Sequence, residues 1–542
     1  MRLRPLLLAV AAGLVLADAS VVTLALPQLL DDLDTSVEGV AAILGIYTAV
    51  LACALLPLER AARSLGIRTV GAAGFALFAL ACLACSQADD LTGMLIARAV
   101  QALGGAAGLV AAFALLDRVE HHGRRLWVGA AVFATALGPA LGGALTSAFD
   151  WPAIFLVQSP VAAAAAVACA VSPAVVPERV ERHRFPVRPS LALALVSAAL
   201  TAVLFLLVLL LVAGWSVEPL RAALNVTVLP VAALAGARIG GAPRTRAAAG
   251  AALLGGGVIA LAFLPDARAW WTVVPQAVAG VGMGLALTAL GGQLLPERTT
   301  HDAARLLTLR HAGIAVILAV LAPIAAAQLD DATARAKERG VAVLLDADLS
   351  LGAKLRSAPA LLRGVEQDRP RAGLTAAIDD ERERLPADDR ASFDEVSDRV
   401  DDVVVTAVGE SFRVPFLITG AAALAAALLL APWPPGGALL GSGALAAATV
   451  AAYGVLYASA APDVVVVRDP CHERPSVPRS GLGGFIEDRA YDVLDAAACR
   501  DGASREELVL AIVDDREAKR YEAEHGRNPR DVLGLLASLL GG

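Results

Sequence analysis

The 542-residue chain is 57% hydrophobic and 18% charged, and its mean hydropathy is +0.66. This composition is too apolar for a soluble protein of that length and indicates a membrane protein. The formal net charge is −7, and neither of the two polar segments described below carries a basic patch of the kind that binds nucleic acid. No His or Cys cluster has metal-ligand spacing, and we expect neither a metal nor a cofactor.

Apolar windows of about 20 residues, enough to cross a bilayer as a helix, recur along the chain. We place thirteen spans near residues 5–26, 39–57, 69–86, 91–116, 126–148, 152–175, 190–214, 219–238, 247–265, 270–294, 305–328, 414–432 and 436–458.

Arginine is concentrated in alternate loops, which predicts that those loops are cytoplasmic. The basic loops contain Arg60 and Arg68, then Arg124 and Arg125, then Arg179 to Arg188, then Arg238 to Arg246, and then Arg298. The loops between them carry mainly Asp and Glu. We therefore expect a multi-pass protein of the cell (inner) membrane whose N-terminus is cytoplasmic.

Two long segments are polar. Residues 330–412 hold 19 acidic against 12 basic residues, and residues 461–542 hold 16 against 11. Thirteen crossings from a cytoplasmic start place both segments, and the C-terminus, on the outer face. Cys471 and Cys499 lie in the second segment, where a pair suits a disulfide in an oxidising compartment, although two free thiols remain an alternative.

Both polar segments show helical patterns. Residues 347–365, "ADLSLGAKLRSAPALLRGV", have helical periodicity, whereas 379–390, "DDERERLPADDR", reads as a solvated charge run with a turn. Ser504 and Glu507 have the spacing of a capping box, and two further amphipathic helices are predicted in 485–498 and 528–540. We expect a compact helical domain at the C-terminus, without an enzyme's catalytic groups.

Polar residues inside predicted spans are costly and so are candidates for function. Asp18 lies in the middle of the first span, where apolar surroundings favour a protonated carboxyl that can carry a proton; a structural, paired Asp is the alternative. Arg98 and Gln101 lie one turn apart in the fourth span, and Arg98 is either a structural pin or part of transport. We expect a substrate cavity to be lined by Gln101 together with Tyr47, Asn225, Gln276 and Arg310, although Asn and Gln often only join helices.

These residues carry a family resemblance. Residues 18–27, "DASVVTLALP", resemble the first-helix motif of the drug:proton antiporters of the major facilitator superfamily, in particular the branch that usually has fourteen helices. "RAVQALGGAA" is similar to the fourth-helix motif of the superfamily, with Arg98 and Gln101 matching. "ALGPALGG" is similar to the antiporter motif of the fifth helix, with Gly138, Pro139, Gly142 and Gly143 matching. "DWPAIFLVQSP" and "GWSVEPLRAALNVTVLP" resemble two further segments of that branch. The resemblance covers about residues 1–330 and the twelfth span.

One loop departs from the family pattern. After the second helix the family has G-x-L-A-D-R-x-G-R-R, and this chain has "ERAARSLGIR". Gly66 fits, but Glu59 replaces the first glycine and Arg63 replaces an aspartate that, in the family, helps to close the cytoplasmic side. This degenerate loop either uses a different closing contact or marks a non-transporting relative.

The resemblance implies an all-α fold of two six-helix bundles that alternate access to a central cavity. We predict an N-terminal bundle in 1–175, a cytoplasmic linker in 176–189, spans 7–11 in 190–329, an outer loop domain in 330–412, span 12 in 413–432, an extra span 13 in 436–458, and an outer C-terminal domain in 461–542.

Two hypotheses for function follow. The first is proton-coupled export of an amphipathic small molecule or envelope lipid, with Asp18 and Arg98 in proton coupling. The second is a transporter-like scaffold or sensor whose outer domains bind an envelope protein or lipid. An enzyme is disfavoured.

Overall fold

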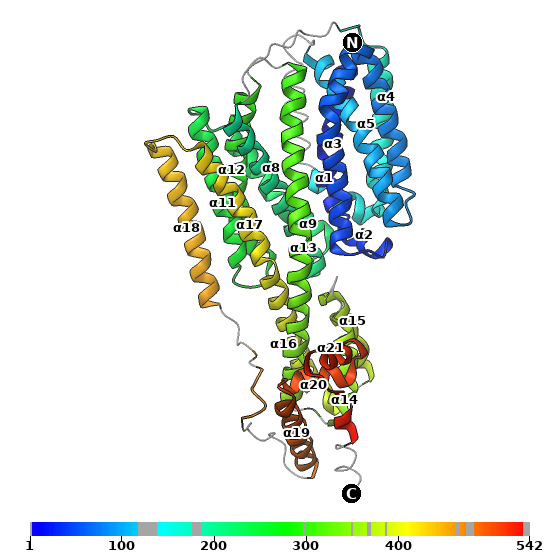
Figure 1. The fold of residues 1–542 in the computed structure, drawn as a ribbon, viewed down its shortest axis with the longest axis vertical. Helices are drawn as coiled ribbons and strands as arrows, with labels where there is room; N and C mark the ends of the chain where they lie inside the picture. The colour runs from blue at the N-terminus through cyan, green and yellow to red at the C-terminus, as the bar shows by residue number, and fades with distance from the viewer. Residues whose placement is uncertain are drawn as a thin grey trace. The chain divides into compact units, whose positions relative to one another are not determined.

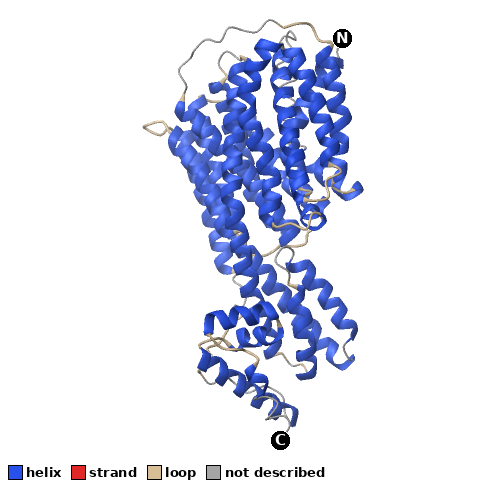
Figure 2. Cartoon of the chain, turned by 45° about the vertical axis from the view of Figure 1, so that its right-hand side comes forward, coloured by secondary structure: helices blue, strands red, loops and turns tan. Residues whose placement is uncertain are grey.

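The computed structural model describes residues 3–117, 138–175, 186–295, 299–347, 349, 351–365, 370–384, 387–460, 465, 467–472 and 482–534. Within these ranges the chain is helical between its loops and contains no strand (Figure 2). The predicted all-α class is therefore confirmed.

The chain divides into two compact units. One consists of Met1–Val212, Val217–Ala326 and Phe412–Ala460, and we call it the membrane unit. The other consists of Ala213–Ser216, Ala327–Ser411 and Ala461–Gly542, and we call it the polar unit.

The first half of the membrane unit is a bundle in which α4 packs on α5 and α7, and α1 packs on α5 and α7 (Figure 1). Its helices are α1 (Leu3–Thr23), α2 (Leu26–Asp32), α3 (Val37–Leu65), α4 (Ile67–Cys85), α5 (Leu91–Asp117) and α7 (Pro152–Ala170). Residues 138–149 are also helical.

In the second half, α11 is central and packs on α12, α17 and α18. The helices are α8 (Val187–Val208), extended by a π-helical turn η1 (Leu209–Gly214), α9 (Pro219–Val226), α10 (Val228–Ala237), α11 (Pro243–Ala260) with η2 (Leu261–Phe263), η3 (Ala269–Thr272), α12 (Val273–Leu294), α13 (Thr300–Asp346), α17 (Arg413–Leu430) and α18 (Gly437–Ser459). Of these helices, α13 is long enough to contribute to both units.

Local chemistry explains several helix starts. The Ser36 side chain caps α3 by accepting from the Gly39 N–H at 3.3 Å. Proline stands at the first position of α7, α9 and α11, where a helix needs no N–H donor.

Twelve described helices are long and apolar enough to cross a membrane. They correspond to twelve of the thirteen predicted spans. The remaining predicted span, 126–148, lies partly outside the described residues, and its described part is helical. The last span, α18, packs mainly on α11, and only 17% of its apolar window is buried, so most of its surface suits lipid.

The polar unit contains α14 (Leu351–Gly364), α15 (Pro370–Arg384), α16 (Ala387–Ser411), α19 (Leu482–Asp501), α20 (Arg505–Val513) and α21 (Asp515–His525). The two polar segments share one core, in which Val341 and Leu362 of the first pack with Leu494 and Leu508 of the second. Within the charge run 379–390, residues 379–384 end α15 and residues 387–390 begin α16. Residues 385 and 386, between the two helices, lie outside the described residues, so the predicted turn is not tested. Of the amphipathic helix predicted in 528–540, residues 531–534 are helical, and residues 535–540 lie outside the described residues.

A buried ion pair also joins the two polar segments. Lys354 Nζ lies 2.6 Å from Glu487 Oε1, and both side chains are almost fully buried. Tyr491 donates to the same carboxylate at 2.9 Å. Burial and the Glu487 carboxylate raise the pKa of the Tyr491 phenol, so it remains a neutral donor.

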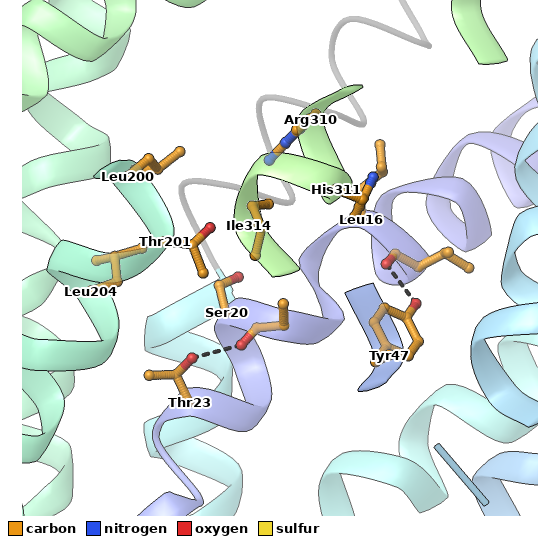
Figure 3. A pocket seen from close by; sticks show the side chains of 12 residues that line it. Leu16, Ser20, Thr23, Tyr47, Leu200, Thr201, Leu204, Arg310, His311 and Ile314 are labelled. Carbon is orange, nitrogen blue, oxygen red and sulfur yellow. Dashed lines mark hydrogen bonds between the residues drawn. The ribbon is translucent and has the colours of Figure 1, made fainter. Parts of the chain in front are cut away.

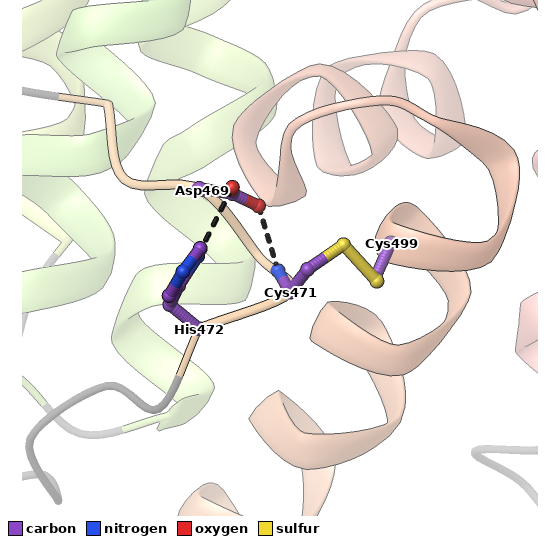
Figure 4. The surroundings of a disulfide bond; sticks show 4 residues. All are labelled: Asp469, Cys471, His472 and Cys499. Atoms are coloured by element: carbon purple, nitrogen blue, oxygen red, sulfur yellow. Dashed lines mark hydrogen bonds and ion pairs between the residues drawn. A yellow bond between two sulfur atoms is a disulfide. The ribbon is translucent and has the colours of Figure 1, made fainter.

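Cys471 and Cys499 form a disulfide that ties the segment before α19 to that helix (Figure 4). The Asp469 side chain accepts from the Cys471 backbone N–H at 2.9 Å and orders this turn. Ser504 caps α20 by accepting from the Glu507 N–H at 3.0 Å, as its spacing predicts.

Candidate functional site

Asp18 lies at the centre of a polar cluster in the first bundle. It comes from α1, is fully buried, and its Oδ2 lies 2.5 Å from Arg98 Nη1 on α5. Gln101 of α5 and Gln158 of α7 each donate to Oδ1 at 3.2 Å. The carboxylate is therefore held by three helices of one bundle, which the packing of α1 on α5 and α7 makes possible.

Arg98 is fully buried as well, and its surroundings suit a permanent cation. Its Nη1 also donates to Gln101 Oε1 at 2.6 Å, and its Nε donates to the Ile43 carbonyl at 3.4 Å. The Tyr47 ring lies under the guanidinium, 4.2 Å from Cζ to the ring centroid. Its Nη2 is buried without a hydrogen-bond partner among the described residues. Asp18 is thus the carboxylate that balances this charge.

Tyr47 separates the Asp18 cluster from a cavity. Its hydroxyl donates to the Val15 carbonyl at 2.9 Å, which fixes the ring between Arg98 and that cavity. The cavity, about 30 Å³, lies between the two halves of the membrane unit (Figure 3). Its lining comes from α1, α3, α8 and α13: Val15, Leu16, Ala19, Ser20, Thr23, Tyr47, Leu200, Thr201, Leu204, Arg310, His311 and Ile314.

Half of the twelve lining residues are aliphatic. Ser20 and Thr23 use their hydroxyls to donate to carbonyls of their own helix at 2.7 and 2.6 Å. No carboxylate is among the described residues that line the cavity. Its volume is enough for a water molecule and too small for an organic molecule.

The other two predicted cavity residues form a separate cluster. Asn225 Oδ1 accepts from Gln276 at 2.8 Å and from Thr272 at 2.9 Å, while Asn225 Nδ2 donates to the Ala269 carbonyl at 3.0 Å. These bonds join α9 to η3 and α12. Neither Asn225 nor Gln276 lines the cavity described above.

The glycines of the 138–143 stretch lie at a close helix contact. A Cβ at Gly142 would meet the Val21 backbone oxygen of α1, and a Cβ at Gly143 would meet Ala223 of α9. The stretch, which Gly138 and Pro139 begin, therefore touches a helix of each half. Small residues permit this approach of backbones.

The segment predicted as a degenerate loop after the second span is helical up to Leu65, as the end of α3, and it makes a contact between the halves. Arg63 lies 2.5 Å from Glu59, and Glu59 is nearly fully buried. His301, at the start of α13, has its Nδ1 3.2 Å from Glu59 and 3.3 Å from Arg63. Gly66 ends α3 with a φ of +96°, a conformation that favours glycine.

Three residues of these sites were not singled out from the sequence. Gln158 lies inside a stretch that the family resemblance matches, so the signal was present. His301 and His311 carry no signal in a single sequence, because their partners are more than two hundred residues away or on their own helix.

Comparison with known proteins identifies the family. A family model described as Major Facilitator Superfamily matches residues 8–332, more than half of the chain. The chain belongs to the Major Facilitator Superfamily. That family comprises membrane transporters rather than enzymes, as the sequence motifs predict.

Several curated relatives of this major facilitator protein have names that refer to drug resistance. The methylenomycin A resistance protein of Streptomyces coelicolor is 32% identical over 235 residues, 42% of this chain and 48% of the relative. The multidrug efflux pump LfrA of Mycolicibacterium smegmatis is 32% identical over 163 residues, 28% of this chain and 32% of the pump. The tetracenomycin C resistance and export protein of Streptomyces glaucescens is 33% identical over 175 residues, 30% of this chain and 31% of the relative. The chain thus spans about half or less of the length of these relatives.

Among solved structures, a bacterial homologue of the human lysosomal transporter Spinster, in an inward-facing and occupied conformation, aligns with a TM-score of 0.55. The alignment covers 83% of this chain and 97% of that one, at 14% identity. This likeness supports the major facilitator fold.

Proposed function

We propose that the protein is a secondary transporter that exports an amphipathic small molecule or envelope lipid in exchange for protons. The observation that carries this proposal is the fully buried Asp18–Arg98 pair beside a cavity between the two halves. Family membership and the names of the efflux relatives support transport of a small molecule.

The geometry suggests how a proton couples to movement. In the present conformation the carboxyl group of Asp18 is paired with Arg98. Protonation of Asp18 removes its charge and leaves Arg98 without a balancing carboxylate in an apolar environment, which is costly. One face of the Tyr47 ring contacts Arg98, and Tyr47 also lines the cavity. A movement of the Arg98 side chain would therefore displace Tyr47 and change the wall of the cavity.

The glycine stretch 138–143 and the contact of Glu59 with His301 lie between the halves. We assign both to closure of the cavity, with the second replacing the family's usual contact. We further propose an inner-membrane location with a cytoplasmic N-terminus and an outer polar unit, which the disulfide supports.

The test is uptake into everted membrane vesicles whose interior is acidified. We expect tetracenomycin C or another amphipathic compound of a panel to accumulate when the gradient is imposed, and Asp18→Asn to reduce that uptake at least tenfold. Asp34→Asn is the matched control, because Asp34 is exposed and its φ of +43° suits asparagine equally. Uptake that Asp18→Asn leaves unchanged would remove Asp18 as the carrier.

A scaffold or sensor remains the second candidate, favoured by the polar unit, most of which lies beyond the family match. Absence of gradient-dependent flux for the whole panel, together with specific capture of an envelope lipid or protein by the full chain, would decide for it.

A further inference from the structure

Arg310 is a partly buried cation for which the described residues provide no counter-ion. It lies on α13 inside the predicted span 305–328, five residues or about 8 Å from the start of that span. Its Nε is buried and has no hydrogen-bond partner among the described residues. No ion pair of Arg310 is present in the described part of the chain.

The neighbouring carboxylate does not fill this role. Asp18 already accepts from Arg98, Gln101 and Gln158, which satisfies both of its oxygens. The described residues that line the cavity include no Asp or Glu. Residues 126–137, the part of the fifth predicted span outside the described residues, contain no acidic residue in their sequence.

Arg310 lines the cavity together with groups that cannot balance its charge (Figure 3). His311 uses its Nδ1–H to donate to the Leu307 carbonyl at 2.7 Å. Aliphatic side chains make up most of the remaining wall. A charged group of this kind within a membrane is costly unless something binds it.

We propose that Arg310 binds the anionic group of the substrate, so that the transported compound is an amphipathic anion. The planar guanidinium donates to a carboxylate, sulfonate or phosphate in a two-point geometry. The apolar body then lies against Leu16, Leu200 and Ile314 once the halves have parted. A permanent cation is repelled by Arg310 and finds no carboxylate in the lining.

This inference rests on the proposed transport function, and it deepens that function by naming the charge of the substrate. The two are tested separately, because anion binding is measured at equilibrium without a pH gradient. If no gradient-driven flux is found, the transport proposal fails but anion binding can still be measured. If the protein does not prefer anions, the anion proposal fails but an uncharged compound can still be transported by the gradient.

The experiment uses the full chain in nanodiscs and two fluorescent probes that share a ring system. 8-Anilinonaphthalene-1-sulfonate carries a sulfonate, and N-phenyl-1-naphthylamine lacks it. We expect Arg310→Gln to weaken binding of the sulfonate probe at least tenfold and to change binding of the neutral probe less than twofold. Arg310→Lys, which keeps the charge, should fall between wild type and Arg310→Gln.

Arg305→Gln is the matched control, because Arg305 is on the same helix but does not line the cavity. It should change neither affinity. Without a ligand, Arg310→Gln should also raise the melting temperature, because it removes a partly buried charge that no described carboxylate balances. Equal binding of the sulfonate probe by wild type and Arg310→Gln, a parallel loss of both probes, or a lower melting temperature of Arg310→Gln would overturn the proposal.

Discussion

At the scale of residues, the chain places two arginines at membrane depth in opposite circumstances. Arg98 has a carboxylate at 2.5 Å, two further acceptors and an aromatic face, whereas Arg310 lines a cavity without an acidic group. The first arrangement is suited to holding and releasing a proton on Asp18. The second is suited to a charge that arrives from outside the protein.

The Asp18–Arg98 pair predicts an asymmetric stability response. Arg98→Met leaves the Asp18 carboxylate buried without a cation and should destabilise the protein by about 3–5 kcal/mol. The double variant Asp18→Leu with Arg98→Met removes both charges and should recover most of that loss. Thermal unfolding of the purified protein checks this, and a double variant no more stable than Arg98→Met would contradict it.

The residues of this site could be predicted from the sequence only in part. Asp18, Arg98 and Gln101 stand out because charged or amide groups within apolar spans are rare. The contact between these three residues could not be predicted from the sequence, because it depends on how α1 packs on α5. Asn225 and Gln276 are also polar residues within apolar spans, but in the structure they hydrogen-bond to each other between two helices and do not line the cavity.

At the scale of elements, glycines and proline in an apolar helix mark the place where backbones meet. Residues 138–143 approach α1 on one side and α9 on the other, so they belong to both halves of the membrane unit. Hydropathy predicted that these spans exist but predicted their ends less accurately. The helix α13 continues to Asp346, because its polar continuation keeps a helical pattern that hydropathy does not detect.

The close approach predicts a cost for any side chain at Gly142. Gly142→Ala brings a Cβ against the Val21 carbonyl oxygen and should lower stability by about 1–3 kcal/mol. Gly45→Ala is the control, because nothing lies within 4 Å of its Cβ position in α3, and it should be neutral or stabilising by about 0.5–1 kcal/mol. Similar melting temperatures for the two variants would show that the 138–143 contact is not tight.

At the scale of the whole molecule, the polar segments 330–411 and 461–542 form one unit although two spans separate them in sequence. Two crossings return the chain to the same side, so the shared core agrees with α17 and α18 both crossing the membrane. Composition identified both segments as polar. It could not show that they pack together, because the contacts of Lys354 with Glu487 span more than a hundred residues.

The topology predicts the labelling of single cysteines by an impermeant maleimide on intact cells. Asp379→Cys and Glu522→Cys place exposed thiols on α15 and α21 and should both react from outside. Arg68→Cys, exposed in a predicted cytoplasmic loop, should react only after permeabilisation. Reaction of either polar-unit cysteine only from the cytoplasm would overturn the proposed orientation and the crossing count.

The central claim is that Asp18 carries the proton that drives transport. Two processes can be measured separately in proteoliposomes that contain the purified protein: accumulation driven by a pH gradient, and counterflow exchange without a gradient. The compound used is one that the vesicle experiment has shown to be transported. The account predicts that Asp18→Asn loses accumulation at least tenfold while counterflow continues at a measurable rate. Accumulation at the wild-type rate in Asp18→Asn, or loss of both processes together, would contradict it.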